Sequence, residues 1–489
     1  MTLKEILNGV ETTSPLNDVL AARQVAYITN DSRKVEPGSL FVAIKGEKAD
    51  GHDFIKAVLD KKPAAIVAQH FPQEVDEAGT GTALITVEDT HEALGLMAAN
   101  YYGNPSRELV LVGVTGTNGK TTIATLLYQM ASKAGLKSGL LSTIANYIGE
   151  IEIPATHTTP DPLQLNSLLR RMADKGCKFA AMEVSSHAAH QRRIAGLKFA
   201  GGVFSNLTRD HLDYHKTAAN YRDAKKLFFD KLPHDAFALV NIDDPNGEFM
   251  LQNCKARKLT YALRRTADFR GRIVERHFNS TLIELNGCQV ETLFTGTFNI
   301  YNLTAVYGAL IALGFDAEET LTNLSTLRPV AGRFQTIPAP GGYMAVVDYA
   351  HTPDALKNVL EALGELLPPG RKIITVVGAG GNRDQGKRPI MAQVAARLSH
   401  RLVLTADNPR FENPDHIIEQ MAAGLDAEAQ AKTLMITNRR QAIRTALSLA
   451  QQGDIVLVAG KGHENYQEIE GVKHHFDDVE EIKEFIKQH

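Results

Sequence analysis

Cysteine is scarce in this chain, and its scarcity limits the kinds of site and the compartment that the sequence allows. Only three of the 489 residues are cysteines, Cys177, Cys254 and Cys288, and no two of them form a CxxC pair. This spacing supports neither a disulfide framework nor a zinc site built from cysteines. A reducing compartment fits best, so we expect the protein to be cytoplasmic.

Long apolar runs and an excess of one charge are also missing. The longest apolar runs, such as residues 455–459, have the length of a strand, far below the ~20 residues that span a bilayer. Lysine and arginine number 53 against 56 acidic residues, which gives a formal net charge of −3. We therefore expect no membrane insertion and no nucleic acid bound through bulk charge.

The length of the chain predicts about three domains, because domains commonly run to roughly 150 residues. Segments rich in glycine and proline at 102–106 and 338–342 suggest the boundaries, so we expect domains at 1–104, 105–337 and 338–489. Short apolar runs alternate with helical stretches in all three, a pattern typical of α/β folds. We expect a small N-terminal α/β domain, a central P-loop domain with a mostly parallel sheet, and a C-terminal Rossmann-like α/β domain.

A glycine-rich loop stands between a strand-like run at 109–114 and a helical stretch, and it reads Gly116-Thr117-Asn118-Gly119-Lys120-Thr121-Thr122. This order of strand, loop and helix is that of a phosphate-binding loop. Lys120 could reach the β- and γ-phosphates, and the Thr121 hydroxyl could bind Mg²⁺. The usual consensus sequence of the phosphate-binding loop is not fully met, because Val114 stands where the first glycine is expected. A glycine-rich turn with an incidental lysine is the alternative interpretation.

Two positions at predicted strand ends further along could bind a second divalent ion. Glu183 ends the apolar run 179–183, and His211 follows Asp210 after another such run. A carboxylate and a neutral imidazole near a P-loop are suitable ligands for such an ion. The alternative for each residue is a helix-capping or core hydrogen-bonding role.

Taken together, these motifs resemble those of the Mur ligases, ATP-dependent amide-forming enzymes that build the peptidoglycan stem peptide. The resemblance extends over essentially the whole chain, with 296–302, Gly332-Arg333 and 348–353 completing the set. It implies that Asn299 and Asn302 lie near the adenine, Arg333 near the γ-phosphate and Asp348 near the ribose. The implied ATP contacts are Gly116, Thr117, Asn118, Gly119, Lys120, Thr121, Thr122, Asn299, Asn302, Arg333 and Asp348.

Three N-terminal segments, 31–33, 37–43 and 50–54, are similar to the family type that extends UDP-N-acetylmuramoyl-L-alanyl-D-glutamate by a third residue. Within the UDP-substrate, the resemblance assigns the uridine nucleotide to Asn30, Ser32, Glu47, Lys48 and Ala49, and the muramoyl dipeptide to Thr158, Thr159, Ser185, Gln191 and Arg193. Hydroxyls and an arginine suit an anionic sugar nucleotide. For Arg192-Arg193 the alternative is a solvated helix face.

Lys225 matches the lysine that Mur ligases carry as a carbamate. A neutral lysine amine that adds CO₂ becomes a carboxylate, which suits Mg²⁺ as a ligand. The neighbouring Lys226 is expected to face solvent. The resemblance implies a metal site, with two Mg²⁺ ions, formed by Thr121, Glu183, His211 and carbamylated Lys225, and a catalytic set of Lys120, Glu183, His211, Lys225 and Arg333.

Polar side chains follow three predicted strands of the last domain, and we expect them to converge because parallel strands end at one sheet edge. They are Arg383, Asp407, Asn408, Pro409, Arg410, Gly460 and Glu464. Residues 407–410 resemble the form of this motif in family members that add meso-diaminopimelate, whereas lysine-adding relatives lack the arginine. A guanidinium would favour the distal carboxylate that distinguishes diaminopimelate from lysine.

The resemblance implies an acid–amino-acid ligase of peptidoglycan precursor synthesis. ATP would phosphorylate the D-glutamate γ-carboxylate, and the diaminopimelate amine would attack the acyl phosphate. The alternatives are the L-lysine-adding ligase of the same family, a folylpolyglutamate synthetase, and a P-loop switch or motor ATPase. The expected partners are small molecules, namely ATP, the UDP-MurNAc-dipeptide and meso-diaminopimelate, and we expect a monomer.

Overall fold

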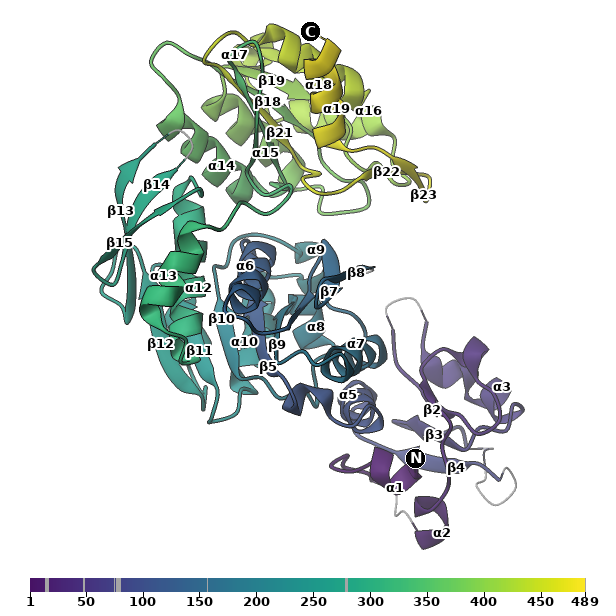
Figure 1. The fold of residues 1–489 in the computed structure, drawn as a ribbon. Helices are drawn as coiled ribbons and strands as arrows, with labels where there is room; N and C mark the ends of the chain where they lie inside the picture. The colour runs from purple at the N-terminus through teal and green to yellow at the C-terminus, as the bar shows by residue number, and fades with distance from the viewer. Residues whose placement is uncertain are drawn as a thin grey trace.

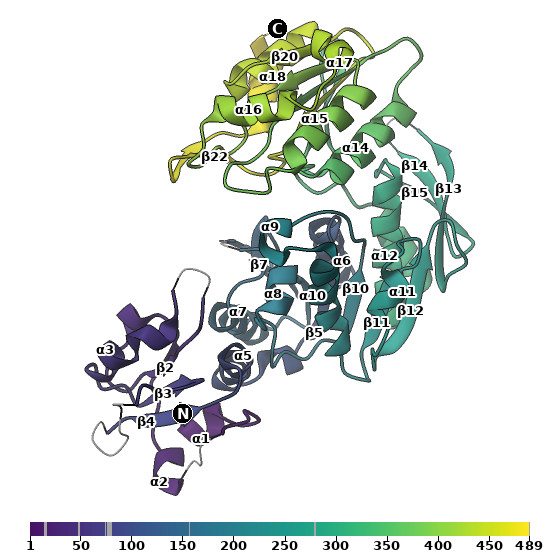
Figure 2. The same cartoon turned by 180° about the vertical axis from the view of Figure 1, so that it is seen from behind.

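The computed structural model of the protein describes residues 1–13, 17–46, 49–73, 75, 81–155, 157–277 and 280–488. Three α/β units follow one another along the chain, each built around its own sheet (Figure 1). The central unit lies between the N-terminal and C-terminal units, and the view from behind agrees (Figure 2). None of the helices in these residues combines the length and the apolar character needed to cross a membrane.

The N-terminal unit is a four-stranded parallel sheet in the order β1-β2-β3-β4. Its strands are β1 (Ile28–Thr29), β2 (Leu40–Val42), β3 (Ala65–Ala68) and β4 (Ala83–Thr86). Its helices are α1 (Leu3–Ile6), α2 (Asp18–Ala21), α3 (Ile55–Leu59) and α5 (Thr90–Tyr101). Asp89 caps α5 by accepting hydrogen bonds from the backbone N–H groups of His91 and Glu92, which sets where this helix begins.

The central sheet has eleven strands in the order β15-β14-β13-β12-β11-β10-β5-β9-β6-β7-β8. Pairing is parallel from β13 through to β6 and antiparallel at both ends, so the expected mostly parallel sheet is confirmed. The strands are β5 (Val110–Thr115), β6 (Ser138–Leu141), β7 (Ala145–Ile148), β8 (Ile151–Pro154), β9 (Phe179–Glu183), β10 (Gly201–Phe204), β11 (Phe237–Asn241), β12 (Arg257–Ala262), β13 (Phe269–Arg276), β14 (Thr281–Leu285) and β15 (Cys288–Thr292).

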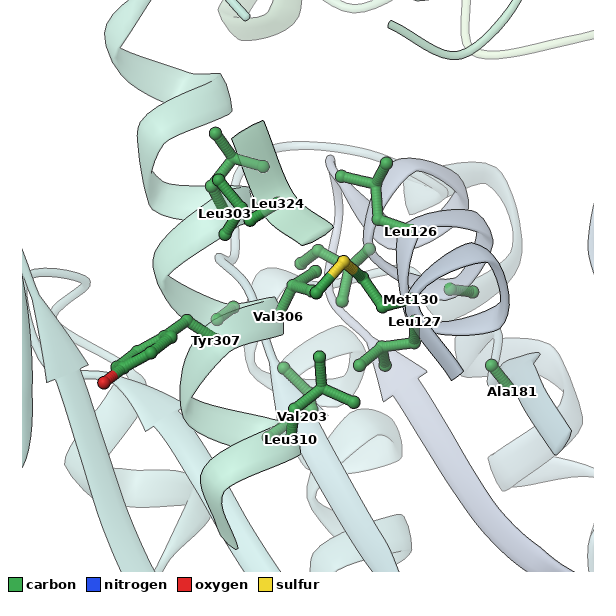
Figure 3. Close-up of a cluster of buried hydrophobic side chains, with 14 of the residues drawn as sticks. Leu126, Leu127, Met130, Ala181, Val203, Leu303, Val306, Tyr307, Leu310 and Leu324 are labelled. Atoms are coloured by element: carbon green, nitrogen blue, oxygen red, sulfur yellow. The ribbon is translucent and has the colours of Figure 1, made fainter. Parts of the chain in front are cut away.

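Helices of the central unit pack on this sheet and hold the loops at its edge. They are α6 (Lys120–Lys133), α7 (Pro162–Asp174), α8 (Ser186–His190), α9 (Leu212–His215), α10 (Ala218–Asp230), α11 (Gly247–Met250), α12 (Thr297–Ala312) and α13 (Ala317–Ser325). Buried side chains of α6, among them Leu127 and Met130, meet Val306 and Leu310 of α12 (Figure 3). Because α6 starts at the P-loop and α12 carries Asn299 and Asn302, this core fixes the asparagines relative to the loop.

The C-terminal unit is a six-stranded sheet in the order β16-β17-β21-β18-β19-β20, parallel except for β16. The strands are β16 (Gln335–Pro338), β17 (Met344–Asp348), β18 (Ile373–Val377), β19 (Arg401–Leu404), β20 (Thr433–Met435) and β21 (Ile455–Ala459). Its helices are α14 (Pro353–Leu366), α15 (Lys387–Leu398), α16 (Pro414–Ala422), α17 (Ala427–Ala431), α18 (Arg439–Leu449) and α19 (Asp478–Gln488), with a hairpin of β22 (Tyr466–Ile469) and β23 (Val472–His475). In this structure β16 begins at Gln335, a few residues before the predicted start of this domain at 338. The exact domain boundaries stay predictions.

Candidate functional site

A cavity of about 590 Å³ lies between the central and C-terminal units. It is lined by the loop after β5, by the ends of neighbouring strands of the central sheet, and by the segment from β17 into α14. The sequence-predicted residues that line it are Thr117, Asn118, Gly119, Lys120, Thr121, Thr122, Thr158, Glu183, Ser185, His211, Lys225, Asn299, Asn302, Arg333 and Asp348.

The P-loop joins β5 to α6 in a shape that requires its two glycines. Gly116 and Gly119 have φ angles of 146° and 87°, and a Cβ atom at Gly119 would stand 2.5 Å from Asn302 Oδ1. At Gly116 a Cβ atom would meet the Ser205 hydroxyl at 2.0 Å, so no larger residue fits. Lys120 Nζ donates to the carbonyl oxygens of Gly116 and Thr117 at 2.9 and 2.7 Å. Burial lowers the pKa of Lys120.

A carboxylate, a hydroxyl and a guanidinium meet at the start of α6. Glu183 ends β9, which runs parallel to β5 with Glu183 opposite Val114. Its Oε1 accepts hydrogen bonds from the Thr121 hydroxyl at 2.9 Å and the Thr143 backbone N–H at 2.7 Å. Arg333 reaches this point from the segment before β16, and its Nη2 donates to Thr121 Oγ1 at 3.0 Å. The C-terminal unit therefore contacts the P-loop directly through Arg333.

Lys225 of α10 is fully enclosed, with 1% of its surface exposed. Its Nζ donates to the Gly116 carbonyl at 2.7 Å and lies 4.6 Å from the centre of the Tyr221 ring. Burial, together with the positive charge of Lys120, lowers the pKa of Lys225 well below its ordinary value. A lowered pKa favours the neutral amine, which is the form that reacts with CO₂.

The expectation that Lys226 faces solvent is wrong. Only 8% of this residue is exposed, and its Nζ donates to the Gln252 carbonyl at 2.6 Å and pairs with Asp230. The Phe249 ring lies 5.8 Å from the same atom. Lys226 is buried because α11 and the segment after it cover this side of α10.

His211 stands at the start of α9 beside other titratable groups. Its Nε2 lies 3.4 Å from Asp210 Oδ2, and its ring is 4.9 Å from that of His187. Burial and the nearby His187, Lys225 and Lys120 hold the pKa of His211 below its ordinary value, so the imidazole is neutral at pH 7. Burial opposes ionisation of Asp210, but the positive charges of Lys387 and of His211 and His351 in their protonated forms at low pH outweigh it and lower the pKa of this carboxyl.

The oxygen atoms near Thr121 are candidate ligands for Mg²⁺. No group of three or more histidine, cysteine, aspartate or glutamate side chains is arranged to hold a metal ion in the part of the chain that the structure describes. Thr121 and Glu183 nevertheless offer a hydroxyl and a carboxylate 2.9 Å apart, and both line the cavity. Magnesium prefers oxygen ligands, so this pair fits one, and a further anionic oxygen nearby would improve the fit.

Asp348 ends β17 and is held by two backbone groups. It is 7% exposed and accepts hydrogen bonds from the N–H groups of Phe334 and Ala350, both at 2.7 Å. Burial raises its pKa to about 6. Asn299 and Asn302 are also buried, and Asn302 Nδ2 donates to Asn299 Oδ1 at 3.4 Å.

Several polar residues that line the same cavity were not among the predicted site residues, although the motifs at 296–302 and 348–353 contain three of them. Asp243 and Asp244 follow β11, and Tyr301 of α12 donates its hydroxyl to Asp243 Oδ2 at 2.7 Å. Tyr349 and His351, which come directly after β17, also line it. The sequence did contain a signal for these residues. All of them except Tyr301 follow the carboxyl end of a parallel strand, where α/β sheets bind ligands.

The residues assigned to the muramoyl dipeptide form a hydrogen-bonded chain. Arg193 donates to Gln191 Oε1 at 3.0 and 2.6 Å and to the Thr159 carbonyl at 2.9 Å, so it does not belong to a merely solvated face. Gln191 Nε2 in turn donates to the Tyr214 hydroxyl at 3.1 Å. Thr158 and Ser185 line the cavity, whereas Thr159, Gln191 and Arg193 do not.

The residues assigned to the uridine nucleotide lie apart from the cavity, in the N-terminal unit. Asn30 and Ser32 follow β1, and Ala49 is exposed in the segment after β2. The Ser32 carbonyl accepts a hydrogen bond from Lys61 Nζ at 2.8 Å. Glu47 and Lys48 lie outside the described residues.

The three loops of the C-terminal unit meet at one sheet edge. Asn408 Nδ2 donates to Glu464 Oε2 at 2.7 Å, and the Asn408 carbonyl accepts from the Gly381 N–H at 2.9 Å. Arg410 Nη1 donates to the Gly381 carbonyl at 2.9 Å. A Cβ atom at Gly460 would stand 2.5 Å from Asp407 Oδ2, so these loops are closely packed.

The two arginines of these loops both come close to Gly380. A Cβ atom at Gly380 would have Arg410 Nη1 at 3.0 Å and Arg383 Cγ at 3.8 Å. Glu468 of β22, which sequence reasoning missed, approaches Arg410 Nε with its Oε2 at 3.3 Å. These loops do not line the 590 Å³ cavity, but Tyr349 connects them to it, because its hydroxyl donates to Glu464 Oε1 at 3.5 Å.

Comparison with known proteins gives a consistent result along the chain. Three family models match: "Mur ligase family, catalytic domain" at residues 24–102, "Mur ligase middle domain" at 114–310, and "Mur ligase, glutamate ligase domain" at 332–462. A protein of Phocaeicola vulgatus named UDP-N-acetylmuramoyl-L-alanyl-D-glutamate--2,6-diaminopimelate ligase is 55% identical over 486 residues, which is 99% of each chain.

Solved structures agree with this. A structure of a UDP-N-acetylmuramoyl-L-alanyl-D-glutamate--2,6-diaminopimelate ligase is 34% identical, covers 100% of this chain and 99% of its own, and has a TM-score of 0.69. The MurF ligase of Thermotoga maritima in complex with ADP shares the fold, with a TM-score of 0.61 and 21% identity over 97% of this chain and 99% of its own. The three-domain α/β fold and the sequence matches along it lead to one conclusion: the chain belongs to the Mur ligase family.

Proposed function

We propose that this protein is an ATP-dependent ligase that joins meso-2,6-diaminopimelate to UDP-N-acetylmuramoyl-L-alanyl-D-glutamate in cytoplasmic peptidoglycan precursor synthesis. The observation that carries the proposal is the meeting of Arg410, Asn408 and Glu464 on loops adjoining a cavity that contains a P-loop. The name of the Phocaeicola vulgatus relative, with 99% of each chain aligned, supports the same substrates.

The first step would transfer the γ-phosphoryl group of ATP to the γ-carboxylate of the D-glutamyl residue. This gives an acyl phosphate and ADP. Lys120 and Arg333 would stabilise the charge on the phosphoryl oxygens. Lys120 is the first residue of α6, and Arg333 contacts Thr121 there from the segment before β16. Asn299, Asn302 and Asp348, which line the same cavity, would bind the nucleoside. The Thermotoga maritima MurF, which shares the fold, was solved with ADP.

Magnesium ions, two in this proposal, would neutralise phosphate charge when bound. Thr121, Glu183, His211 and carbamylated Lys225 would hold them. Lys225 suits this modification, because its amine is buried and its pKa is lowered well below the ordinary value. The carbamate would add further anionic oxygens to the carboxylate that Glu183 already provides.

The second step would be attack by the diaminopimelate amine on the acyl carbon, with phosphate as the leaving group. The proposed role of Arg410 and Arg383 is to bind the distal carboxylate, while Glu464, Asn408 and Asp407 face the ammonium group. Glu464 already accepts from Asn408 and Lys461, at 2.7 and 3.3 Å, so its carboxylate has a fixed direction. These groups would orient the amine rather than react themselves.

The acyl phosphate must be kept from water, and contacts between the units support a closed arrangement. Arg276 Nη2 lies 3.0 Å from Glu365 Oε2, and Arg209 Nε lies 3.8 Å from Asp384 Oδ2. Both pairs join the central unit to the C-terminal unit. We propose that they, together with Arg333, hold the two units around the substrates while the reaction proceeds.

Phosphate release measured with ATP and the UDP-MurNAc-dipeptide tests the proposal. Release should require meso-diaminopimelate, and neither L-lysine nor a folate substrate should replace it. Turnover with lysine alone would refute the proposed amino acid, and ATP hydrolysis without any amino acid would refute the ligase. We also propose that the enzyme is a monomer, which light scattering on the purified protein would test.

A further inference from the structure

A buried ion pair joins the first residues of the last two helices of the chain. Arg439 begins α18 and Asp478 begins α19, and both side chains are 0% exposed. Arg439 Nε donates to Asp478 Oδ1 at 2.8 Å, and Nη2 donates to Oδ2 at 2.7 Å. The carboxylate therefore fixes the plane of the guanidinium.

The remaining donors of Arg439 point at two strand ends. Nη2 donates to the Ala459 carbonyl at 3.0 Å, and Nη1 donates to the Ala406 carbonyl at 3.4 Å. Ala459 is the last residue of β21, directly before Gly460, and Ala406 directly precedes Asp407. One guanidinium thus holds the points from which two of the three pocket loops leave the sheet.

Those two loops have little room to shift relative to each other. Asn408 of one loop donates to Glu464 of the other at 2.7 Å, and Gly460 is packed against Asp407 so closely that a Cβ atom would collide. A displacement of about 1 Å in a substrate-positioning group can lower a rate by roughly 10²-fold. A contact that fixes both loop origins therefore matters for the pocket that they form.

Stability alone does not account for an arginine at this position. A buried ion pair is often no more stabilising than an apolar pair of similar size, so two apolar side chains could dock α19 equally well. A second pair, Arg440 with Glu481, already joins α18 to α19 at 2.6 Å, with Arg440 half exposed. What distinguishes Arg439 is the set of donors that it directs at the strand ends.

We propose that Arg439, oriented by Asp478, is a positioning residue for the amino-acid pocket, and that the C-terminal helix α19 is thereby part of the machinery that binds the incoming amino acid. The inference rests on the proposed function, because it takes the loops at 407–410 and 460–464 to be the diaminopimelate pocket.

The decisive experiment replaces the ion pair by an apolar pair, Arg439→Met with Asp478→Leu, in the full-length enzyme. The KM values for meso-diaminopimelate, ATP and the UDP-MurNAc-dipeptide are measured beside the melting temperature. We expect the KM for diaminopimelate to rise about 10- to 100-fold, with the other two KM values changed less than about twofold. An unchanged KM for diaminopimelate in the folded double variant would overturn the proposal.

Two further variants keep the test decisive if the double variant does not fold. Arg439→Lys keeps the charge beside Asp478 but cannot reach the carboxylate and both carbonyls at once, so the KM for diaminopimelate should still rise. The matched control is Arg440→Ala, which weakens the same helix contact without touching a strand end, and it should leave that KM unchanged. Equal KM values for Arg439→Lys and the wild type would overturn the inference.

The wild-type enzyme is assayed first, which separates this inference from the proposed function. If wild-type phosphate release does not depend on diaminopimelate, the proposed function fails, and the pocket inference fails with it. If the wild type depends on diaminopimelate but the Arg439 variants match its KM, only the pocket inference fails.

Discussion

Replacing Arg410 by alanine should remove the preference for diaminopimelate over lysine. The Arg410 side chain is 20% exposed, and its Nη1 is held by the Gly381 carbonyl at 2.9 Å. Its Nε faces Glu468 Oε2 at 3.3 Å, so Nη2 is the nitrogen atom left to meet a ligand carboxylate. The substitution removes that donor and leaves Glu468 facing the incoming carboxylate.

The size of the effect follows from this partly exposed setting. Loss of a buried charge-assisted pair costs about 2–5 kcal/mol, and one-fifth exposure favours the lower part of that range. A loss of about 2–3 kcal/mol corresponds to a fall in kcat/KM for diaminopimelate of roughly 30- to 160-fold. Lysine lacks the distal carboxylate, so its kcat/KM should change little, and the two amino acids should become similar substrates.

Phosphate release at varied amino-acid concentration measures both values, with the KM for ATP and for the UDP-MurNAc-dipeptide determined in the same series. Glu468→Gln is the matched control, because it keeps the guanidinium and removes only a partly exposed ion pair. Such pairs contribute about 0–1 kcal/mol, so the control should change kcat/KM by no more than about fivefold. Equal losses with all three substrates in Arg410→Ala, or an unchanged ratio of diaminopimelate to lysine, would refute the reasoning.

Three other substitutions test other parts of the site. Lys225→Ala should abolish phosphate release, and short carboxylic acids such as acetate should restore part of it; full activity without them would contradict the carbamate. Asp348 has a folded-state pKa of about 6, above the ordinary 3.8, so its ionisation penalises the folded state. The stability that the protonated Asp348 carboxyl contributes is therefore fully present below about pH 4. As the pH rises to about 6, the free energy of unfolding should fall by about 3 kcal/mol. Urea unfolding of Asp348→Asn should not show this fall. An identical pH dependence in variant and wild type would show that the carboxyl is not perturbed. Tyr214→Phe removes the hydroxyl that binds Gln191 and should raise the KM for the UDP-MurNAc-dipeptide about 5- to 30-fold, with the KM for ATP unchanged as the internal control.

Local sequence patterns were sufficient for the architecture and the phosphate loop. Alternating apolar and helical stretches predicted α/β units, and the loop at 116–122 combines a strand, glycines and a helix start within a few residues. The convergence of Arg410, Asn408 and Glu464 was predictable for another reason: parallel strands end at one sheet edge, whatever their separation in the sequence. A topological rule thus replaced information that local patterns lack.

Side-chain burial and long-range partners were beyond the sequence. Lys226 is buried because α11, which follows it after another strand, covers it, and no feature of α10 alone indicates this. Tyr301 donates to Asp243 from α12, a helix that starts more than fifty residues later in the chain. Arg439 reads as one of two adjacent arginines at a helix start, and only the packing of β19, β21 and α19 distinguishes it from Arg440.

The hydrogen bonds of Lys120 and Arg333 have a consequence for how tightly a nucleotide can be held. Lys120 already donates to two carbonyls of its own loop, and Arg333 already donates to Thr121. An incoming phosphate can take over these donors from the protein acceptors. It can also add hydrogen bonds, because Lys120 Nζ has a third N–H and no described residue accepts from the buried Arg333 Nε. After transfer of the phosphoryl group, the same carbonyls and hydroxyl can again accept hydrogen bonds from Lys120 and Arg333 as the product departs. The loop carbonyls and the Thr121 hydroxyl thus compete with the phosphate for the N–H groups of Lys120 and Arg333. This competition favours rapid turnover over tight retention of ADP.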